Sequence, residues 1–202
     1  MKKMLIISFL IISSILISSC TAHNYKETYF VHAVGFEKSD DEYKIHAVCE
    51  KLEDQEKNYF VVTKSGNTIN QATKELIREY SDCYFATAEI YIIPNENKQS
   101  LIPHLAKEIC DSNVYPSKSF IISTDENIKY FLSRVKSEED LKKIGKLTRN
   151  NKTNAIKYFS LFLAEKTIEI PSLEFNKSGT MAITKDNKHK INDKESKNEK
   201  DI

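Results

Sequence analysis

The chain has 202 residues, enough for one substantial hydrophobic core with a tail, and its 30 Lys and Arg residues nearly balance 29 Asp and Glu residues. This balance excludes the strongly basic surface that is typical of nucleic-acid-binding proteins. The sequence also has no excess of acidic residues, which would indicate a cationic partner. We therefore expect one domain with no nucleic acid among its partners.

The first 19 residues have the layout of a secretory signal. Two lysines open the chain, a mostly apolar run covers residues 4–17, and Ser18 and Ser19 precede Cys20. The apolar run is shorter than the roughly 20 residues that a membrane-spanning helix needs. The last four residues of this stretch, one aliphatic, two small and a cysteine, resemble the bacterial lipobox.

The lipobox resemblance implies that a lipid is attached to Cys20 and that the chain is cleaved just before it. Two acyl chains hold a protein stably at a membrane, whereas one gives only marginal binding. We therefore expect a signal peptide over 1–19, a lipidated (palmitate-bearing) Cys20, a linker over 20–28, and anchoring on the outer, non-cytoplasmic face of the cell membrane. The alternative is a plain secretory signal or a short anchor, with Cys20 incidental.

Three strands are expected next. Residues 29–36 are apolar on both faces, which is typical of an inner strand. After a turn at 38–42, residues 43–52 alternate between apolar and polar, which predicts a half-buried strand hairpinned with the first. A further β-rich run covers residues 59–63.

The middle of the chain predicts alternating helices and strands. A helix is expected to begin after an Asn67 or Thr68 cap and to end near Tyr80. Residues 84–93 alternate as a single strand would, with Tyr84 inward. The remaining predictions are helices from Ser100 to about Asp111, from Thr124, from Ser137 and over 153–165, and strands over 118–123 and 179–184.

These elements predict one α+β domain over residues 29–184, in which several helices pack on a mixed β-sheet. Residues 185–202 are almost entirely polar and charged. Such a segment buries too little apolar surface to offset its ordering entropy, so a disordered tail is expected there.

The cysteines give no metal-binding pattern. With Cys20 assigned to lipid, Cys49, Cys83 and Cys110 remain, and an odd number allows at most one disulfide bond within the chain. Their spacings fit no zinc site. Free, buried thiols are the expected state.

Other catalytic and cofactor motifs are also missing from the sequence. The four glycines are too dispersed for a phosphate-binding loop, and the histidines have no metal spacing. The one candidate cluster is His32 and His46 facing each other across the first hairpin, with Glu50 on the same side as His46. Such a trio could bind a metal in principle, but ordinary polar residues on a sheet face are the better explanation, so no cofactor and no metal are expected.

Four segments carry a family resemblance because of their order behind a lipobox cysteine. They are the strand pair Val31–Phe36 and Tyr43–Val48, the turn and helix start Ser65–Ala72, the stretch Tyr84–Ile93, and Gly179–Asp186 after Ile170–Leu173. Together they resemble the N-terminal domain of the Ger(x)C (GerAC-like) spore-germination lipoproteins, in which a Gly-x-Thr/Ser-Ile turn opens a helix and a Tyr-Phe strand follows.

The resemblance covers Cys20 to Asp186 and implies a function. Members of that family are non-catalytic C-type subunits of nutrient germinant receptors, which contain a polytopic A-type subunit and a second membrane subunit in the spore inner membrane. They are longer than this chain and continue into further α/β domains. In this chain polar residues 188–192 stand where the family's first domain ends in an apolar segment, and the family's acidic-Arg dipeptide after the lipidated cysteine is missing.

Two other hypotheses remain open. One is a generic surface lipoprotein that binds a ligand or an envelope partner. The other is an exported enzyme, for which His32, His46 and Glu50 are the candidate residues. For any partner, the exposed loops at 53–58 and 95–99 are the expected contact sites, because binding residues concentrate in loops.

Overall fold

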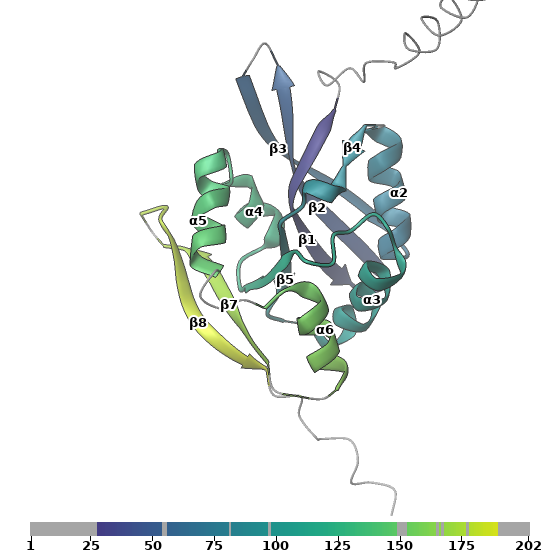
Figure 1. The fold of residues 1–202 in the computed structure, drawn as a ribbon, viewed down its shortest axis with the longest axis vertical. Helices are drawn as coiled ribbons and strands as arrows, with labels where there is room; N and C mark the ends of the chain where they lie inside the picture. The colour runs from purple at the N-terminus through teal and green to yellow at the C-terminus, as the bar shows by residue number, and fades with distance from the viewer. Residues whose placement is uncertain are drawn as a thin grey trace, which may run out of the picture.

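A mixed β-sheet forms the middle of the domain and is covered by helices on both faces (Figure 1). The computed structural model describes residues 28–189, except 54, 55, 81, 97, 149–152, 165, 167 and 177. The predicted signal peptide over 1–19 and Cys20 lie outside the described residues, as does all of the predicted linker over 20–28 except Thr28. None of the helices in the described ranges is long and apolar enough to cross a membrane.

The sheet has the strand order β3-β2-β1-β5-β6-β7-β8. Strands β1 (Tyr29–Ser39), β2 (Glu42–Glu53) and β3 (Glu56–Gly66) form an antiparallel meander at one edge. Next to β1, the strands β5 (Ile90–Pro94), β6 (Phe120–Thr124) and β7 (Ile168–Phe175) run parallel to it and to one another. Strand β8 (Met181–His189) closes the other edge antiparallel to β7, and the short β4 (Cys83–Tyr84) pairs with the start of β1.

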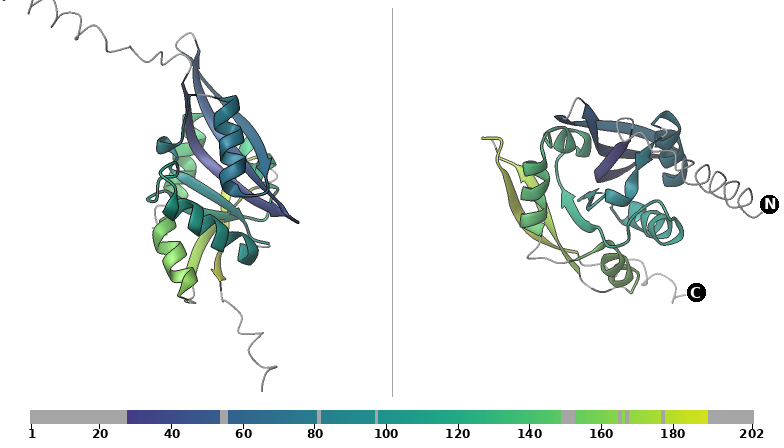
Figure 2. Two further views of the ribbon diagram at one scale, coloured as in Figure 1. Left: turned by 90° about the vertical axis from the view of Figure 1, so that its right-hand side faces the viewer. Right: turned by 45° about the horizontal axis from the view of Figure 1, so that its top comes forward.

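The helices form two layers, one on each face of the sheet (Figures 1 and 2). Helices α2 (Ile69–Glu79), α3 (Lys98–Asp111) and α6 (Ala155–Leu163) share the larger hydrophobic core with one face. Helices α4 (Ile128–Ser133) and α5 (Glu138–Thr148) share the smaller core with the other. The parallel strands are therefore buried on both sides, as such strands usually are.

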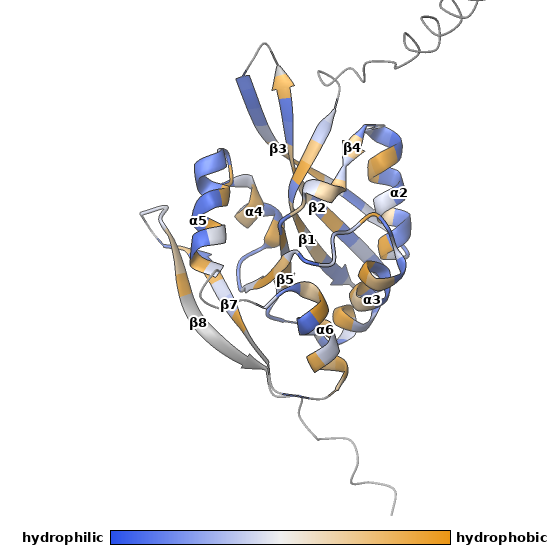
Figure 3. Ribbon diagram, in the orientation of Figure 1, coloured by the Kyte–Doolittle hydropathy of each residue, from blue (hydrophilic) through white to orange (hydrophobic). Residues whose placement is uncertain are grey.

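Strand β1 contributes to both cores, because its successive side chains alternate between the two faces of the sheet. Val34 and Phe36 pack into the core under α2, α3 and α6, whereas Ala33 packs into the core under α4 and α5. Gly35 also faces α4, where a Cβ atom would lie 2.2 Å from Cγ2 of Ile128. Figure 3 shows apolar (orange) and polar (blue) stretches alternating along the helices. The close approach of α4 to β1 depends on this glycine.

The predicted fold class is confirmed, since one domain holds a mixed sheet packed by helices. The end of the domain differs from the prediction. Strand β8 continues to His189, five residues beyond the expected boundary at 184, and residues 185–189 therefore do not belong to the tail. Polar residues can extend β8 because the hydrogen bonds that pair it with β7 are made by the backbone and do not depend on side chains. The added pairs run from Ser172↔Lys185 to Ile168↔His189. Residues 190–202 lie outside the described part of the chain.

The stretch 84–93 is not a single strand. It divides into β4, a short 3₁₀ helix over Phe85–Thr87 and β5. Tyr84 was expected inward, yet it is 52% exposed, and Phe85 takes the buried position instead. The reason is long-range: Thr87 Oγ1 lies 2.8 Å from the carbonyl oxygen of Val31 and ties the turn to β1.

Helix boundaries follow side-chain caps. Thr68 caps α2 as expected, its Oγ1 accepting the amide hydrogen of Gln71 at 3.1 Å. Helix α4 was expected to start at Thr124, but that residue ends β6. The helix starts four residues later, after Asn127 Oδ1 accepts the amide hydrogen of Tyr130 at 3.0 Å.

Strand β7 was not predicted. Pro171 lies within it, and a proline argues against an inner strand because it has no amide hydrogen to donate. Pro171 is tolerated because β7 pairs with β6 at only one registered position, Ser123↔Ser172, so few backbone hydrogen bonds are needed on that side.

Candidate functional site

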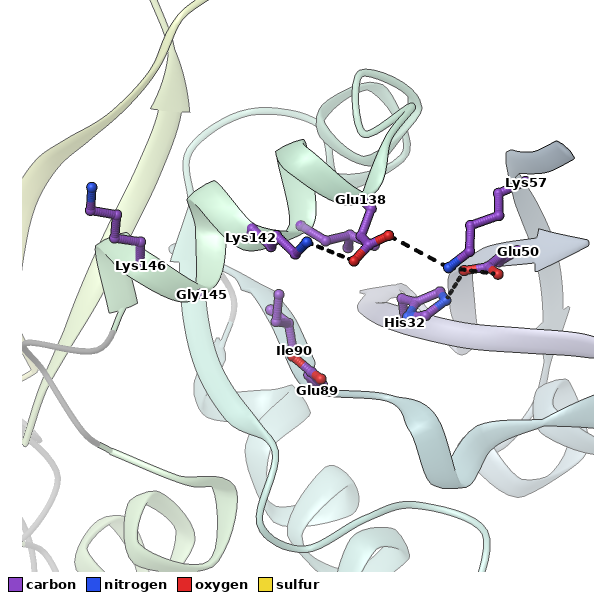
Figure 4. A pocket seen from close by; sticks show the side chains of 10 residues that line it. His32, Glu50, Lys57, Glu89, Ile90, Glu138, Lys142, Gly145 and Lys146 are labelled. Carbon is purple, nitrogen blue, oxygen red and sulfur yellow. Dashed lines mark hydrogen bonds and ion pairs between the residues drawn. The ribbon is translucent and has the colours of Figure 1, made fainter.

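A cleft of about 510 Å³ opens between α5 and the sheet, and most of the side chains that line it are charged or titratable. Its floor comes from β1, β2, β3 and β5, and its wall from one face of α5 (Figure 4). The residues that line it are His32, Glu50, Lys57, Glu89, Ile90, Glu138, Leu141, Lys142, Gly145 and Lys146.

Glu50 is at the centre of the site. Its side chain is 9% exposed, and its carboxylate lies 2.8 Å from His32 Nε2 and 3.3 Å from Lys57 Nζ. Tyr59 Oη donates a third hydrogen bond at 2.9 Å. Tyr59 lies directly opposite Glu50 in the β2–β3 ladder, so the register of the hairpin places the two together.

Hydrogen bonding decides the ionisation of Glu50. Burial opposes the charged form, but the hydrogen bonds from Tyr59, His32 and Lys57 outweigh it and hold the pKa of Glu50 below its usual value. Burial, together with the bond to Glu50, raises the pKa of Tyr59. Glu50 is therefore a weak base and a permanent negative charge near neutral pH.

The charges continue from the sheet onto α5. Lys57 Nζ lies 3.5 Å from Glu138 Oε2, and Lys142 Nζ lies 2.7 Å from the other oxygen of Glu138. Figure 4 shows this line of alternating charges, with Lys146 one turn further along α5. Glu138 and Lys142 are four residues apart, which places them on one helix face.

The predicted trio of His32, His46 and Glu50 is only partly assembled. His32 and Glu50 meet, because the register of β1 against β2 shifts between Val31 and Ala33. His46 is instead buried between Thr63 Oγ1 at 2.9 Å and Glu37 Oε2 at 3.2 Å.

His46 belongs to a second polar network, beside α4. The hydrogen bond from His46 lowers the pKa of Glu37, and burial opposes that effect only in part. The other carboxylate oxygen of Glu37 accepts the amide hydrogen of Ile128 at 3.1 Å, at the start of α4. His46 therefore helps to connect the sheet to α4, with Glu37 as the link between them. In the ranges that the structure describes, no three His, Cys, Asp or Glu side chains are placed to hold a metal ion.

The three cysteines differ in exposure. Cys49 is buried, Cys83 is half-buried and Cys110 is exposed, and all three are free. Burial was expected for each, but Ile109 takes the inward position at the end of α3 and leaves Cys110 outside. A hydrogen bond with Cys83, together with burial, raises the pKa of Cys49 and keeps it in the thiol form.

Sequence reasoning missed Lys57, Tyr59, Glu138 and Lys142. Alternation along β3 places Lys57 and Tyr59 on one face, and pairing β3 with β2 would have placed that face beside Glu50. From the sequence, Glu138 fits the usual place of an acidic residue at a helix start, which gives no sign of a partner on the sheet. Its contact with Lys57 depends on how α5 packs on the sheet.

A second, more apolar cleft of about 660 Å³ lies on the other side of α5, against the β7–β8 hairpin. Leu147, Phe175, Met181 and Ile183 line it, and Lys146 contributes to both clefts.

Comparison of the chain with family models, with curated proteins and with solved structures gave no match in any of the three searches.

Proposed function

We propose that the protein is a lipid-anchored, non-catalytic subunit of a spore germinant receptor, acting through protein–protein contacts on the outer face of the membrane. Its partners would be a polytopic A-type subunit and a second membrane subunit. The observation that carries the proposal is the order of the four Ger(x)C-like segments behind the lipobox cysteine Cys20.

The chemistry of the cleft supports binding rather than proton transfer. A general base works best with a pKa near the working pH. The pKa of Glu50 is lowered, because its carboxylate accepts hydrogen bonds from Tyr59 and His32 and pairs with Lys57. An ordered line of paired charges can instead recognise a complementary charged surface and define the orientation of a partner.

Co-purification from spores tests the proposal. The full chain, tagged at its C-terminus, would be isolated from spore membranes in mild detergent, and the proteins that accompany it identified by mass spectrometry. The expected result is a polytopic germination subunit that is lost when Cys20 is replaced in Cys20→Ala. Cys110→Ala is the matched control, because Cys110 is an exposed cysteine elsewhere in the chain and its loss should leave the complex intact.

A second pair of variants tests the cleft as the contact surface. Lys142→Glu reverses a charge on the cleft wall, whereas Lys129→Glu does so on α4, outside the residues that line the cleft. Loss of the partner only with Lys142→Glu would support the cleft. A protein present in growing-cell membranes and absent from spores, or isolated without a polytopic subunit, would overturn the receptor proposal and favour a generic ligand-binding lipoprotein.

A further inference from the structure

One end of the domain, where β1 begins, carries an exposed aromatic pair. Phe30 on β1 is paired in register with Tyr84 on β4, and their rings meet edge to face with centroids 6.3 Å apart. Tyr84 is 52% exposed and Phe30 is half-buried. Thr87 Oγ1 lies 3.0 Å from the carbonyl oxygen of Tyr84 and fixes the turn that holds this ring outward.

The proposed anchor lies close to this end. Only seven residues lie between Cys20 and Thr28, and the eight residue-to-residue steps that join them span at most about 29 Å. Strand β1, with its 11 residues, is itself about 36 Å long. A lipid on Cys20 would therefore keep the start of β1 near the membrane, while α6 lies at the opposite end of the domain (Figures 1 and 2).

We propose that this end rests on the bilayer, with Phe30 and Tyr84 in the headgroup layer. The inference rests on the proposed lipid at Cys20. Tyrosine suits that layer because its ring is apolar and its hydroxyl remains in water. Leu52, half-buried at the end of β2, adds apolar surface, and the Lys51 ammonium lies 5.8 Å from the centre of the Tyr29 ring, where its apolar stem can cover the ring.

Aromatic insertion, not charge, would drive this contact. Glu56, the first residue of β3, is exposed and disfavours an anionic surface. The contact is therefore expected on neutral phosphatidylcholine vesicles and at high salt, since screening weakens attraction between exposed charges but not apolar burial.

The absence of tryptophan from the chain makes a single-tryptophan test possible. Tyr84→Trp would report on the proposed contact, and Leu163→Trp is the matched control, because Leu163 is 63% exposed on α6 at the far end of the domain. Both full-length lipidated proteins would be reconstituted into phosphatidylcholine vesicles with and without brominated acyl chains, which quench nearby tryptophan. Phe30→Trp provides a second reporter should Tyr84→Trp fail to fold.

The expected result is emission about twofold lower in brominated vesicles for Tyr84→Trp, with Leu163→Trp unchanged, since a headgroup-level ring lies beside the acyl chains. Equal emission with and without bromine, in protein that remains vesicle-bound through its lipid, would overturn this inference and leave the anchor standing. Protein whose mass shows no lipid on Cys20 would overturn both.

Discussion

At the scale of single residues, Glu50, at the floor of the cleft, connects three side chains. Three donors from two strands converge on one nearly buried carboxylate. Removing its charge would weaken all three contacts, although Lys57 would keep its ion pair with Glu138. A buried polar group without its partner costs about 1–3 kcal/mol, which is more than a surface ion pair contributes. The neighbouring pair of Lys142 and Glu138 is exposed and is expected to contribute little.

We predict that Glu50→Gln lowers the free energy of unfolding at pH 7 by about 1–3 kcal/mol. The pKa of Glu50 is lowered in the folded protein, so its stabilisation is present above the ordinary glutamate pKa of about 4.3 and is lost as pH falls through the lower folded value. Urea unfolding of both proteins between pH 7 and pH 3 should therefore show the difference shrinking below about pH 4.

Glu138→Gln is the control for this prediction, because that carboxylate also faces Lys57 but is half exposed. Its effect should be smaller than that of Glu50→Gln at pH 7. A difference for Glu50→Gln that stays constant down to pH 3 would contradict the assignment of the effect to ionisation.

At the scale of elements, α4 and α5 depend on glycine in opposite ways. Gly35 on β1 lies against Ile128 and Leu132 of α4, with no room for a Cβ atom. Gly145 lies within α5, where an added Cβ atom would meet nothing within 4 Å. One glycine is required by packing, and the other only weakens its helix.

We predict that Gly35→Ala destabilises the protein by about 1–3 kcal/mol through overpacking, whereas Gly145→Ala stabilises it by about 0.5–1 kcal/mol through helix propensity. Thermal unfolding followed by circular dichroism would measure both. A stabilising Gly35→Ala would mean that α4 can move away from β1 at little cost.

At the scale of the whole molecule, the last strand of the sheet extends by five residues into the segment that the composition assigned to a tail. The last five residues of β8 pair with Ile168 to Ser172 of β7, which is held to β6 at one registered pair. The edge at β8 is thus the part of the sheet with the fewest connections to the rest.

We predict that truncation after Thr184 lowers the melting temperature relative to truncation after His189. The shorter chain loses the ladder opposite Ile168–Ser172, and β7 becomes an open edge. Hydrogen exchange should show faster exchange of β7 amides in the shorter chain. Equal melting temperatures and equal exchange would show that residues 185–189 add nothing to the sheet.

Much of the fold could be predicted from periodicity, because it reports which side of an element is buried. The alternation in β2 and the apolar stripe of α2 located both elements to within a few residues. The stretch around Tyr84 could not be predicted in this way, since its turn is decided by Thr87 bonding to Val31, 56 residues away.

The candidate site was predictable only in part, for the same reason. His32 and Glu50 lie on adjacent strands of one hairpin, and local pairing brought them together. Lys57 could follow from the register of β3, but Glu138 comes from a helix whose position depends on the packed core under α4 and α5. The lipidation of Cys20 is a prediction of the sequence alone.

The charges on the edge strand β3 affect how readily two molecules can aggregate through their sheets. Strand β3 ends the sheet with β2 on one side only, and such an edge invites pairing with a strand of another molecule. Its outer stretch carries Glu56 and Lys57, both exposed, and Lys64 binds Glu79 of α2. Lysines on an edge strand hinder a second chain from adding to it. Under the proposed lipid anchoring, molecules gathered on one membrane would therefore be protected from edge-to-edge aggregation.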